Sequence, residues 1–400
     1  MAAAAEGRTS LLPKGAAGWF LGFLLLWLPV TIWRSADSAL AWEIAGYIYF
    51  ALVGFVALIN WPPLHKHPEW LVLLLLMLGV ALAVIGPEAF SVNPDKMLDV
   101  YQTEEFSLVD PTQKGETINP NILGGALALI LPQGLALALR WPWTRRRWLP
   151  LLLWAPLLVM GNGLVLSQSR SSWLAVGVAV LLLCWLLLRI PAPTTAAGRG
   201  KLSFWRRALL GIFMVSLFVA PLLLWRTGIA GALITPDLQQ STQTSLVRRI
   251  DIWRLSLQMV GSNALTGIGL GGYEAAFTAY FPTLPLTQGR AAPPHAHHLF
   301  LQLALDLGLP GLLAYLGLWI VLLRALLVQL YQRSKTRQGL AHQAATHGVA
   351  IGLSSALVAM LIVGCFDNAL WGTKLTFVPW CLFALAYLSG EVENPNVLVT

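Results

Sequence analysis

The sequence predicts an all-α polytopic membrane protein with about ten transmembrane helices. Of its 400 residues, 57% are hydrophobic and only 11% are charged, which is less than half of the charged share of soluble domains. The apolar residues also form runs long enough to cross a bilayer, which takes about 20 residues of helix. These runs are too long and too uniformly apolar for barrel strands, so only helices can satisfy their backbone groups in hydrocarbon.

The apolar runs divide the chain into three parts. We predict spans at about residues 18–33, 40–60, 69–86, 120–139, 148–167, 171–189, 208–226, 308–330, 345–365 and 372–390. Seven spans then form an N-terminal bundle over 1–226, and three form a C-terminal bundle over 308–400. The segment 227–307 between them is too long to lack structure in a compact protein, so we expect it to be organised and to carry functional residues.

The basic residues predict the orientation. Sixteen of the 26 Lys and Arg residues fall in loops that share one side if the N-terminus is cytoplasmic, as the positive-inside rule requires. Both termini are then cytoplasmic and the 227–307 loop is outside. The same distribution accounts for the net charge of +8, so nucleic acid is not an expected partner. None of the ten spans has a charged residue near its middle, which argues against an ion-coupled carrier.

A hydroxyl-rich turn, Ser167–Ser172, places Arg170 between two spans at the predicted outer surface. A guanidinium held there is a good anion receptor, and the hydroxyls of Ser169 and Ser171 and the following helix N-terminus add donors. A short polar turn in which Arg170 only reaches toward lipid headgroups fits the local sequence equally well.

An amphipathic helix is predicted over 244–261. Its apolar stripe recurs at helical spacing and consists of Leu246, Ile250, Trp253, Leu257 and Val260. We expect this helix to lie on the membrane or on the bundle near the outer leaflet, with Arg248 and Arg249 off the stripe. These arginines bind either a phosphate ligand or anionic headgroups. The glycine-rich segment 267–272 follows, and because no strand precedes it we interpret it as a packing turn rather than a nucleotide loop.

Three of the seven histidines, His295, His297 and His298, fall within four residues at the start of a predicted helical run. A histidine at this surface can act as a general base near neutral pH or pair as a cation with phosphate. Zinc is the competing chemistry, but no cysteine and no HExxH motif accompanies the cluster, so we predict no metal and no cofactor. A loop of inert histidines stays open as an alternative.

Taken together, these motifs resemble the O-antigen ligase and polymerase superfamily of bacterial envelope glycosyltransferases. The motifs that carry the resemblance, within about residues 120–390, are Ser169–Trp173, Arg249–Trp253, Leu265–Tyr273, His297–Gln302 and Asp306–Gly311. The resemblance implies a GT-C-like helical bundle in the cytoplasmic membrane. It also implies transfer of a glycan from a polyprenyl-diphosphate carrier to an acceptor hydroxyl on the outer face, with neither nucleotide sugar nor metal.

Site residues follow from the resemblance by position. It implies that Arg170 and Arg249 hold the diphosphate and that His297 acts at the reacting centre. The further candidates are Arg248 and Arg290 for the diphosphate, His295 and His298 for catalysis, and Ser169, Ser171, Trp253 and Asp306 as supporting residues. His298 and Asp306 depart from the family pattern, which usually has Asn and Glu there. A polymerase on the same scaffold and a transporter of bicarbonate-like anions or glycans remain alternatives.

Overall fold

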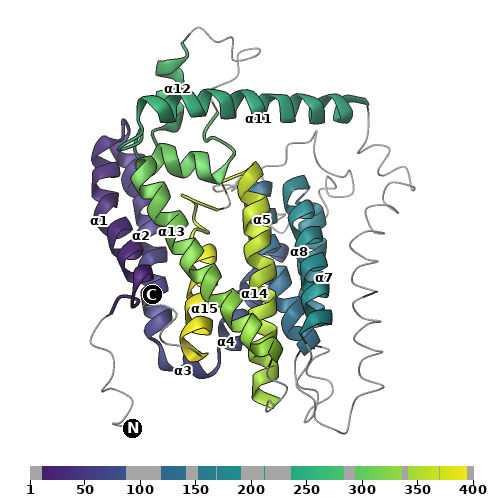
Figure 1. Cartoon of the computed structure of the whole chain (residues 1–400). Coiled ribbons are helices and arrows are strands. Elements are labelled where there is room, and N and C mark those ends of the chain that lie inside the picture. The colour runs from purple at the N-terminus through teal and green to yellow at the C-terminus, as the bar shows by residue number, and fades with distance from the viewer. Residues whose placement is uncertain are drawn as a thin grey trace. The chain divides into compact units, whose positions relative to one another are not determined.

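The structure, a computed structural model, describes residues 11–86, 119–140, 152–167, 169–190, 211, 236–282, 293–335, 341–368 and 370–393. Helices are the regular secondary structure of these residues, and strands are absent from them, as the predicted all-α class requires. The helices (Figure 1) are α1 (Ala16–Arg34), α2 (Ser38–Asn60), α3 (Pro62–Lys66), α4 (Glu69–Ile85), α5 (Pro120–Arg140), α7 (Trp154–Leu166), α8 (Arg170–Arg189), α11 (Pro236–Ser262), α12 (Tyr273–Tyr280), α13 (Leu299–Lys335), α14 (Ala341–Phe366) and α15 (Phe377–Glu393).

Six helices among the described residues are long and apolar enough to cross a membrane, namely α1, α2, α5, α8, α13 over Leu299–Tyr331 and α14 over His347–Phe366. Three more predicted spans correspond to shorter apolar helices, which are α4, α7 and α15. The predicted span at 208–226 lies outside the described residues except for residue 211. The polytopic class is therefore confirmed by these helices, whereas the number of ten spans and the outer position of 227–307 stay predictions.

The chain divides into two compact units, each assembled from separate stretches of sequence. Unit 1 contains 1–71, 249–332 and 364–400, and unit 2 contains 72–248 and 333–363. The three-part division along the sequence at 226 and 307 stays a prediction.

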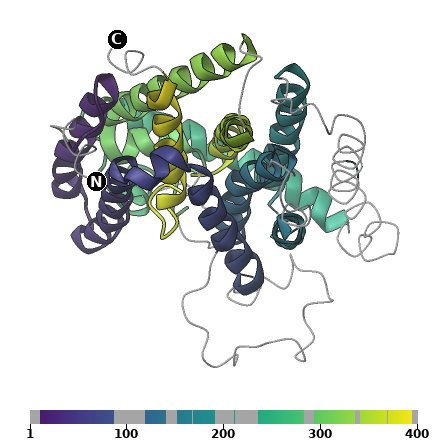
Figure 2. The same ribbon diagram turned by 90° about the horizontal axis from the view of Figure 1, so that it is seen from below.

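In unit 1, α2 packs against both α1 and α15, and Figure 2 shows the purple α2 next to the yellow α15. The fully buried Phe55 of α2 meets Trp380 and Tyr387 of α15 at ring-centroid distances of 5.8 and 6.4 Å. Edge-to-face aromatic pairs of this kind contribute about 0.5–1.5 kcal/mol beyond their buried area. These contacts hold α15 against α2.

In unit 2, the buried helix α5 packs against α7 and α8. Its last residue, Arg140, is only 4% exposed and donates to the carbonyl oxygens of Leu187 and Ile190 at the end of α8. The last carbonyls of a helix have no partner within the helix and carry its negative dipole end. The guanidinium therefore closes the C-terminus of α8 and ties it to α5.

The glycine-rich segment is a packing turn in unit 1, as predicted. Gly267 has a φ of +70°, and a Cβ there would lie 2.2 Å from the Leu305 carbonyl oxygen, so only glycine fits without a shift. Ile268 N donates to that same oxygen at 2.7 Å, and Leu309 N donates to the Ala264 oxygen at 2.7 Å. The turn is thereby bonded to the beginning of α13.

Helix α13 is broken at Gly308, whose φ of 70° and ψ of 176° are not helical. The break separates the short run Leu299–Leu307, which follows the histidine motif, from the longer apolar run. The backbone at Gly308 approaches the Leu265 carbonyl so closely that a Cβ would lie 2.1 Å from its oxygen. The prediction of a helical run followed by a separate span at 308–330 agrees with this break.

The predicted helix over 244–261 is confirmed within α11, and its predicted apolar stripe is packed in part, because Val260 lies against the buried cluster of unit 1. Ile250 and Leu257 are 51% and 58% exposed, whereas Ser256 and Met259 are fully buried. The Ser256 hydroxyl lies 2.8 Å from the Tyr273 hydroxyl of α12, and Met259 packs with Tyr273 and Phe277. Hydrophobic spacing alone does not predict that Ser256 is buried, whereas the position of the exposed apolar residues on the membrane stays a prediction.

Candidate active site

The histidine motif sits in a short loop that a buried hydrogen-bond network fixes to α13. The Ala296 N–H donates to Gln302 Oε1 at 2.9 Å, and Gln302 Nε2 donates to Asp306 Oδ1 at 2.9 Å. The indole of Trp371 donates to the other oxygen of Asp306 at 2.8 Å. Because buried polar groups are costly without partners, this network specifies one position for the loop. Through Gln302, Asp306 thus helps to hold Ala296, which lies between His295 and His297.

His297 has an unusual backbone conformation, with a φ of 49°. The left-handed region costs an L-residue about 1–2 kcal/mol, so the surroundings must impose it. The indole of Trp253 in α11 donates to the His297 carbonyl oxygen at 3.2 Å, and the preceding Ala296 N–H is held by Gln302. Backbone strain of this kind is concentrated at functional sites.

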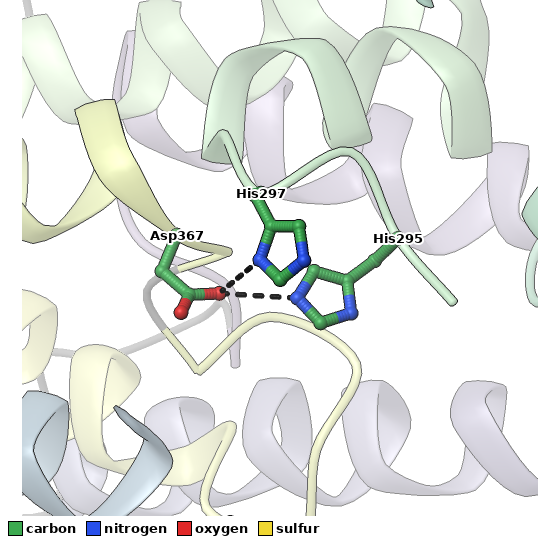
Figure 3. Close-up of side chains that lie close together, drawn as sticks. All are labelled: His295, His297 and Asp367. Atoms are coloured by element: carbon green, nitrogen blue, oxygen red, sulfur yellow. Dashed lines mark hydrogen bonds and ion pairs between the residues drawn. The ribbon is translucent and has the colours of Figure 1, made fainter. Parts of the chain in front are cut away.

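Asp367, which directly follows α14, faces both imidazoles (Figure 3). Its Oδ1 lies 3.2 Å from His295 Nε2 and 3.8 Å from His297 Nδ1, and the two rings are 4.1 Å apart between centroids. The carboxylate side chain is 9% exposed and the imidazoles are 20% and 24% exposed. The main-chain N–H of Asn368 also donates to Oδ1, at 2.8 Å. Sequence reasoning did not identify Asp367.

The electrostatics of this cluster favour a carboxylate facing a neutral imidazole. Burial by itself would raise the pKa of Asp367, but the adjacent imidazoles of His295 and His297 outweigh it and hold that pKa well below its usual range. Burial lowers the pKa of His297; the Asp367 carboxylate opposes this, and His295 and Arg249 add to it. At neutral pH His297 is therefore uncharged and able to accept a proton beside a fixed negative charge.

His298 faces different neighbours. Its ring meets the Trp253 ring edge-on at 5.4 Å between centroids and lies 5.7 Å from Phe300. Its Nδ1 accepts a long hydrogen bond of 3.5 Å from the Leu301 N–H in the first turn of α13. Burial lowers the pKa of His298. The three predicted histidines thus divide into a pair at Asp367 and one ring packed on Trp253.

The predicted phosphate-binding arginines lie in different parts of the chain. Arg249 is half-buried on α11, one turn before Trp253, and its charge acts on His297. The side chain of Arg248 and all of Arg290 lie outside the described residues. Within unit 1 the structure therefore brings Arg249, Trp253 and the histidine motif together.

Arg170 belongs to unit 2, where it is the first residue of α8 and is exposed. The Ser169 hydroxyl before it lies 3.3 Å from that of Ser171 and 2.9 Å from that of Ser172. The hydroxyls thus bond to one another around the start of the helix. An exposed guanidinium at a helix N-terminus can receive an anion, because both carry positive charge there.

A comparison with protein families matches residues 155–316 to the family described as O-antigen ligase. No curated protein matches the chain. The matched range includes Arg170, Arg249, the histidine motif and Asp306, whereas Asp367 follows it in the sequence. The match and the six apolar helices fit a multi-pass protein of the inner membrane. Residues 155–316 are therefore similar to the O-antigen ligase family, which confirms the resemblance to the O-antigen ligase and polymerase superfamily.

Proposed function

We propose that this protein is a metal-independent membrane glycan ligase that transfers a glycan from a polyprenyl-diphosphate carrier to an acceptor hydroxyl. The reaction takes place on the outer face of the cytoplasmic membrane, and both termini are cytoplasmic. The observation that carries the proposal is the His297 imidazole beside the Asp367 carboxylate, next to a domain matched to O-antigen ligases. Such a pair is suited to removing a proton from an alcohol.

In the proposed reaction His297 accepts the proton of the acceptor hydroxyl as its oxygen bonds to the anomeric carbon. The bond from that carbon to the diphosphate breaks, and its electron pair leaves with the diphosphate. Asp367 stabilises the imidazolium that forms, since it stays ionised in this cluster. No protein nucleophile is needed, because the acceptor oxygen displaces the leaving group directly. His295 and His298 are the other catalytic candidates in the same loop.

The leaving diphosphate gains charge as the anomeric bond breaks, so cations fixed beside it stabilise the transition state more than the ground state. Arg249 and Arg170 are proposed for this role, with Arg248 and Arg290 as further diphosphate ligands. Arginine suits it because the planar guanidinium can bind two phosphate oxygens at once. Arg249 also stands one helical turn from Trp253, which bonds the main chain of His297.

The proposal is tested by in vitro transfer from a lipid-diphosphate glycan to a hydroxyl acceptor with the purified protein. We expect His297→Ala to lower kcat by about 10²- to 10⁴-fold, the usual contribution of a general base. Arg249→Ala should also lower the rate, whereas Arg254→Ala, which removes an exposed arginine from the same helix, should leave it close to native. Undiminished transfer in both His297→Ala and Arg249→Ala would remove the mechanism.

The acceptor distinguishes ligase from polymerase in the same assay. A ligase extends a separate acceptor once, whereas a polymerase joins repeat units and yields a ladder when the lipid-linked glycan is offered alone. Uptake of labelled bicarbonate or glycan into vesicles tests the transporter alternative. Saturable flux in the absence of any transfer product would favour the transporter.

A further inference from the structure

The cluster of His295, His297 and Asp367 has the composition and spacing of a metal site with three protein ligands. One ligand atom from each residue lies within 4.8 Å of the others. In tetrahedral zinc sites the metal lies about 2.0–2.2 Å from nitrogen and oxygen ligands, so neighbouring ligand atoms are separated by little more than three ångströms. The distances from Asp367 Oδ1 to His295 Nε2 and His297 Nδ1, 3.2 and 3.8 Å, are close to that separation.

We propose that these three residues bind one divalent transition-metal ion of the zinc class. The ligands are His295 Nε2, His297 Nδ1 and Asp367 Oδ1, and the fourth position is left to water or a substrate oxygen. The sequence argument against metal rested on the histidine motif alone, which offers no cysteine and no HExxH. The third ligand lies 72 residues after His295 and joins the motif only in the fold.

Three features favour metal binding at this cluster: its accessibility to ions, the chemistry of its donor atoms and the fixed position of the histidine loop. The His295 imidazole is 20% exposed, so an ion can reach the cluster from that side, while His297 Nδ1 is buried and the 9% exposed carboxylate supplies a negative charge with little competing hydration. The Ala296–Gln302 and Trp253–His297 hydrogen bonds already hold the loop, so few groups must be ordered when the ion binds. Arg249 opposes the ion, because its charge acts on His297.

His297 cannot bind the metal ion and act as the proposed base at the same time. This consequence for transfer rests on the proposed function. An imidazole that coordinates through Nδ1 keeps its proton on Nε2 and has no nitrogen left to accept another. Zinc is then an inhibitor of transfer that occupies the site in place of the reacting hydroxyl. Zinc binding is measured without any transfer reaction, so a failure of the metal-site proposal can be distinguished from a failure of the proposed function.

The test is zinc binding to the full chain, purified in detergent without a polyhistidine tag and titrated against a competing chelator. We expect about one tightly bound zinc ion per chain. His295→Ala and Asp367→Asn should each weaken binding by about tenfold or more, and Arg249→Ala should strengthen it. Asp367→Asn keeps the size and the hydrogen-bond acceptor of the side chain, so loss of zinc there reports the ligand and not unfolding.

His67→Ala is the matched control, because His67 and Glu69 also form a histidine–carboxylate pair, at 3.0 Å. That variant should keep the native affinity. Cobalt replaces zinc as a second probe, and the native protein should show the visible absorption of tetrahedral cobalt while Asp367→Asn does not. Native protein that binds no zinc, or zinc binding unchanged in both His295→Ala and Asp367→Asn, would overturn the proposal.

Discussion

Asp367 raises the pKa of His297, so the replacement of Asp367 should change that pKa in a predictable direction. Burial lowers the pKa of His297, and the carboxylate raises it again in part. Asp367→Asn removes the opposing contribution, so the pKa of His297 falls further. The acid limb of the pH profile of kcat/KM should therefore move to lower pH.

The same variant should lower kcat by about tenfold or more, since the neutral amide no longer stabilises the imidazolium. The measurement is a pH–rate profile of glycan transfer for the native protein and Asp367→Asn, with Arg254→Ala as the control. Arg254 is an exposed residue of α11 that has no role in the proposed reaction. An acid limb that stays in place or moves to higher pH would contradict the assigned partnership.

At the scale of single residues, the sequence predicted the histidines and arginines as site residues but gave no prediction for Asp367. Short motifs show only what is close in sequence, and this carboxylate follows α14, far beyond the histidine loop. One signal was available: the positive-inside orientation places 366–371 on the same side as the histidines, and Asp367 is the acidic residue of that loop. The division of His295 and His297 from His298 depends on packing against Trp253 and needed coordinates.

At the scale of elements, the network around Asp306 predicts a measurable stability difference. Trp371→Phe keeps a ring at this position but leaves the buried Asp306 Oδ2 without the indole donor. An unsatisfied buried acceptor costs about 1–3 kcal/mol. Unfolding in detergent should show that loss for Trp371→Phe. Trp173→Phe, whose indole bonds a backbone carbonyl at a partly exposed site, should lose about 1 kcal/mol or less.

A positioning role for the network around Asp306 also predicts a change in the kinetics of transfer. Gln302→Leu removes two hydrogen bonds, the one that Gln302 accepts from the Ala296 N–H and the one that it donates to Asp306 Oδ1. We expect kcat for transfer to fall more than KM rises, because the loop that carries the candidate base loses its fixed position. A variant whose stability falls while kcat and KM stay native would show that the network only stabilises the fold.

The non-helical backbone at Gly308 in α13 predicts that a methyl group added at this position destabilises the protein. Gly308→Ala places a Cβ 2.1 Å from the Leu265 carbonyl oxygen, in a backbone conformation that essentially only glycine adopts. The variant should lose at least about 2 kcal/mol of unfolding free energy. Gly261→Ala, which meets no atom within 4 Å at the exposed end of α11, should be neutral or slightly stabilising. Equal behaviour of the two alanine variants would refute the strained turn.

Elements were predicted well where hydrophobic length decides them and poorly where packing does. The runs that became α1, α2, α5 and α8 are visible in composition alone, because hydrocarbon permits no other backbone. In α11 the apolar stripe predicts a face that lies on the membrane or on the bundle. Ile250 and Leu257 of that stripe are exposed, and the fully buried residues Ser256 and Met259 lie off it. A serine whose hydroxyl bonds a tyrosine can turn toward a core, and hydrophobic periodicity does not register such a bond.

For the whole molecule, the orientation across the membrane is the central prediction. In a cysteine-free background, Ser262→Cys should react with a membrane-impermeant maleimide in intact spheroplasts, because the 227–307 loop is predicted to be outside. Lys66→Cys, at an exposed site in a loop predicted to be cytoplasmic, should react only after lysis. Both side chains are exposed, so reactivity reports sidedness and not burial. The reverse labelling pattern would place the histidine motif in the cytoplasm.

The hydrogen bond from Trp253 to the His297 carbonyl has a mechanical consequence. Arg249 and Trp253 occupy successive turns of one rigid rod, so whatever pulls on the guanidinium also pulls on the indole and, through it, on the peptide unit that aims the imidazole. If the proposed diphosphate binds at Arg249, it would therefore also shift the orientation of the His297 ring, so that binding of the donor would prepare the site for the acceptor alcohol.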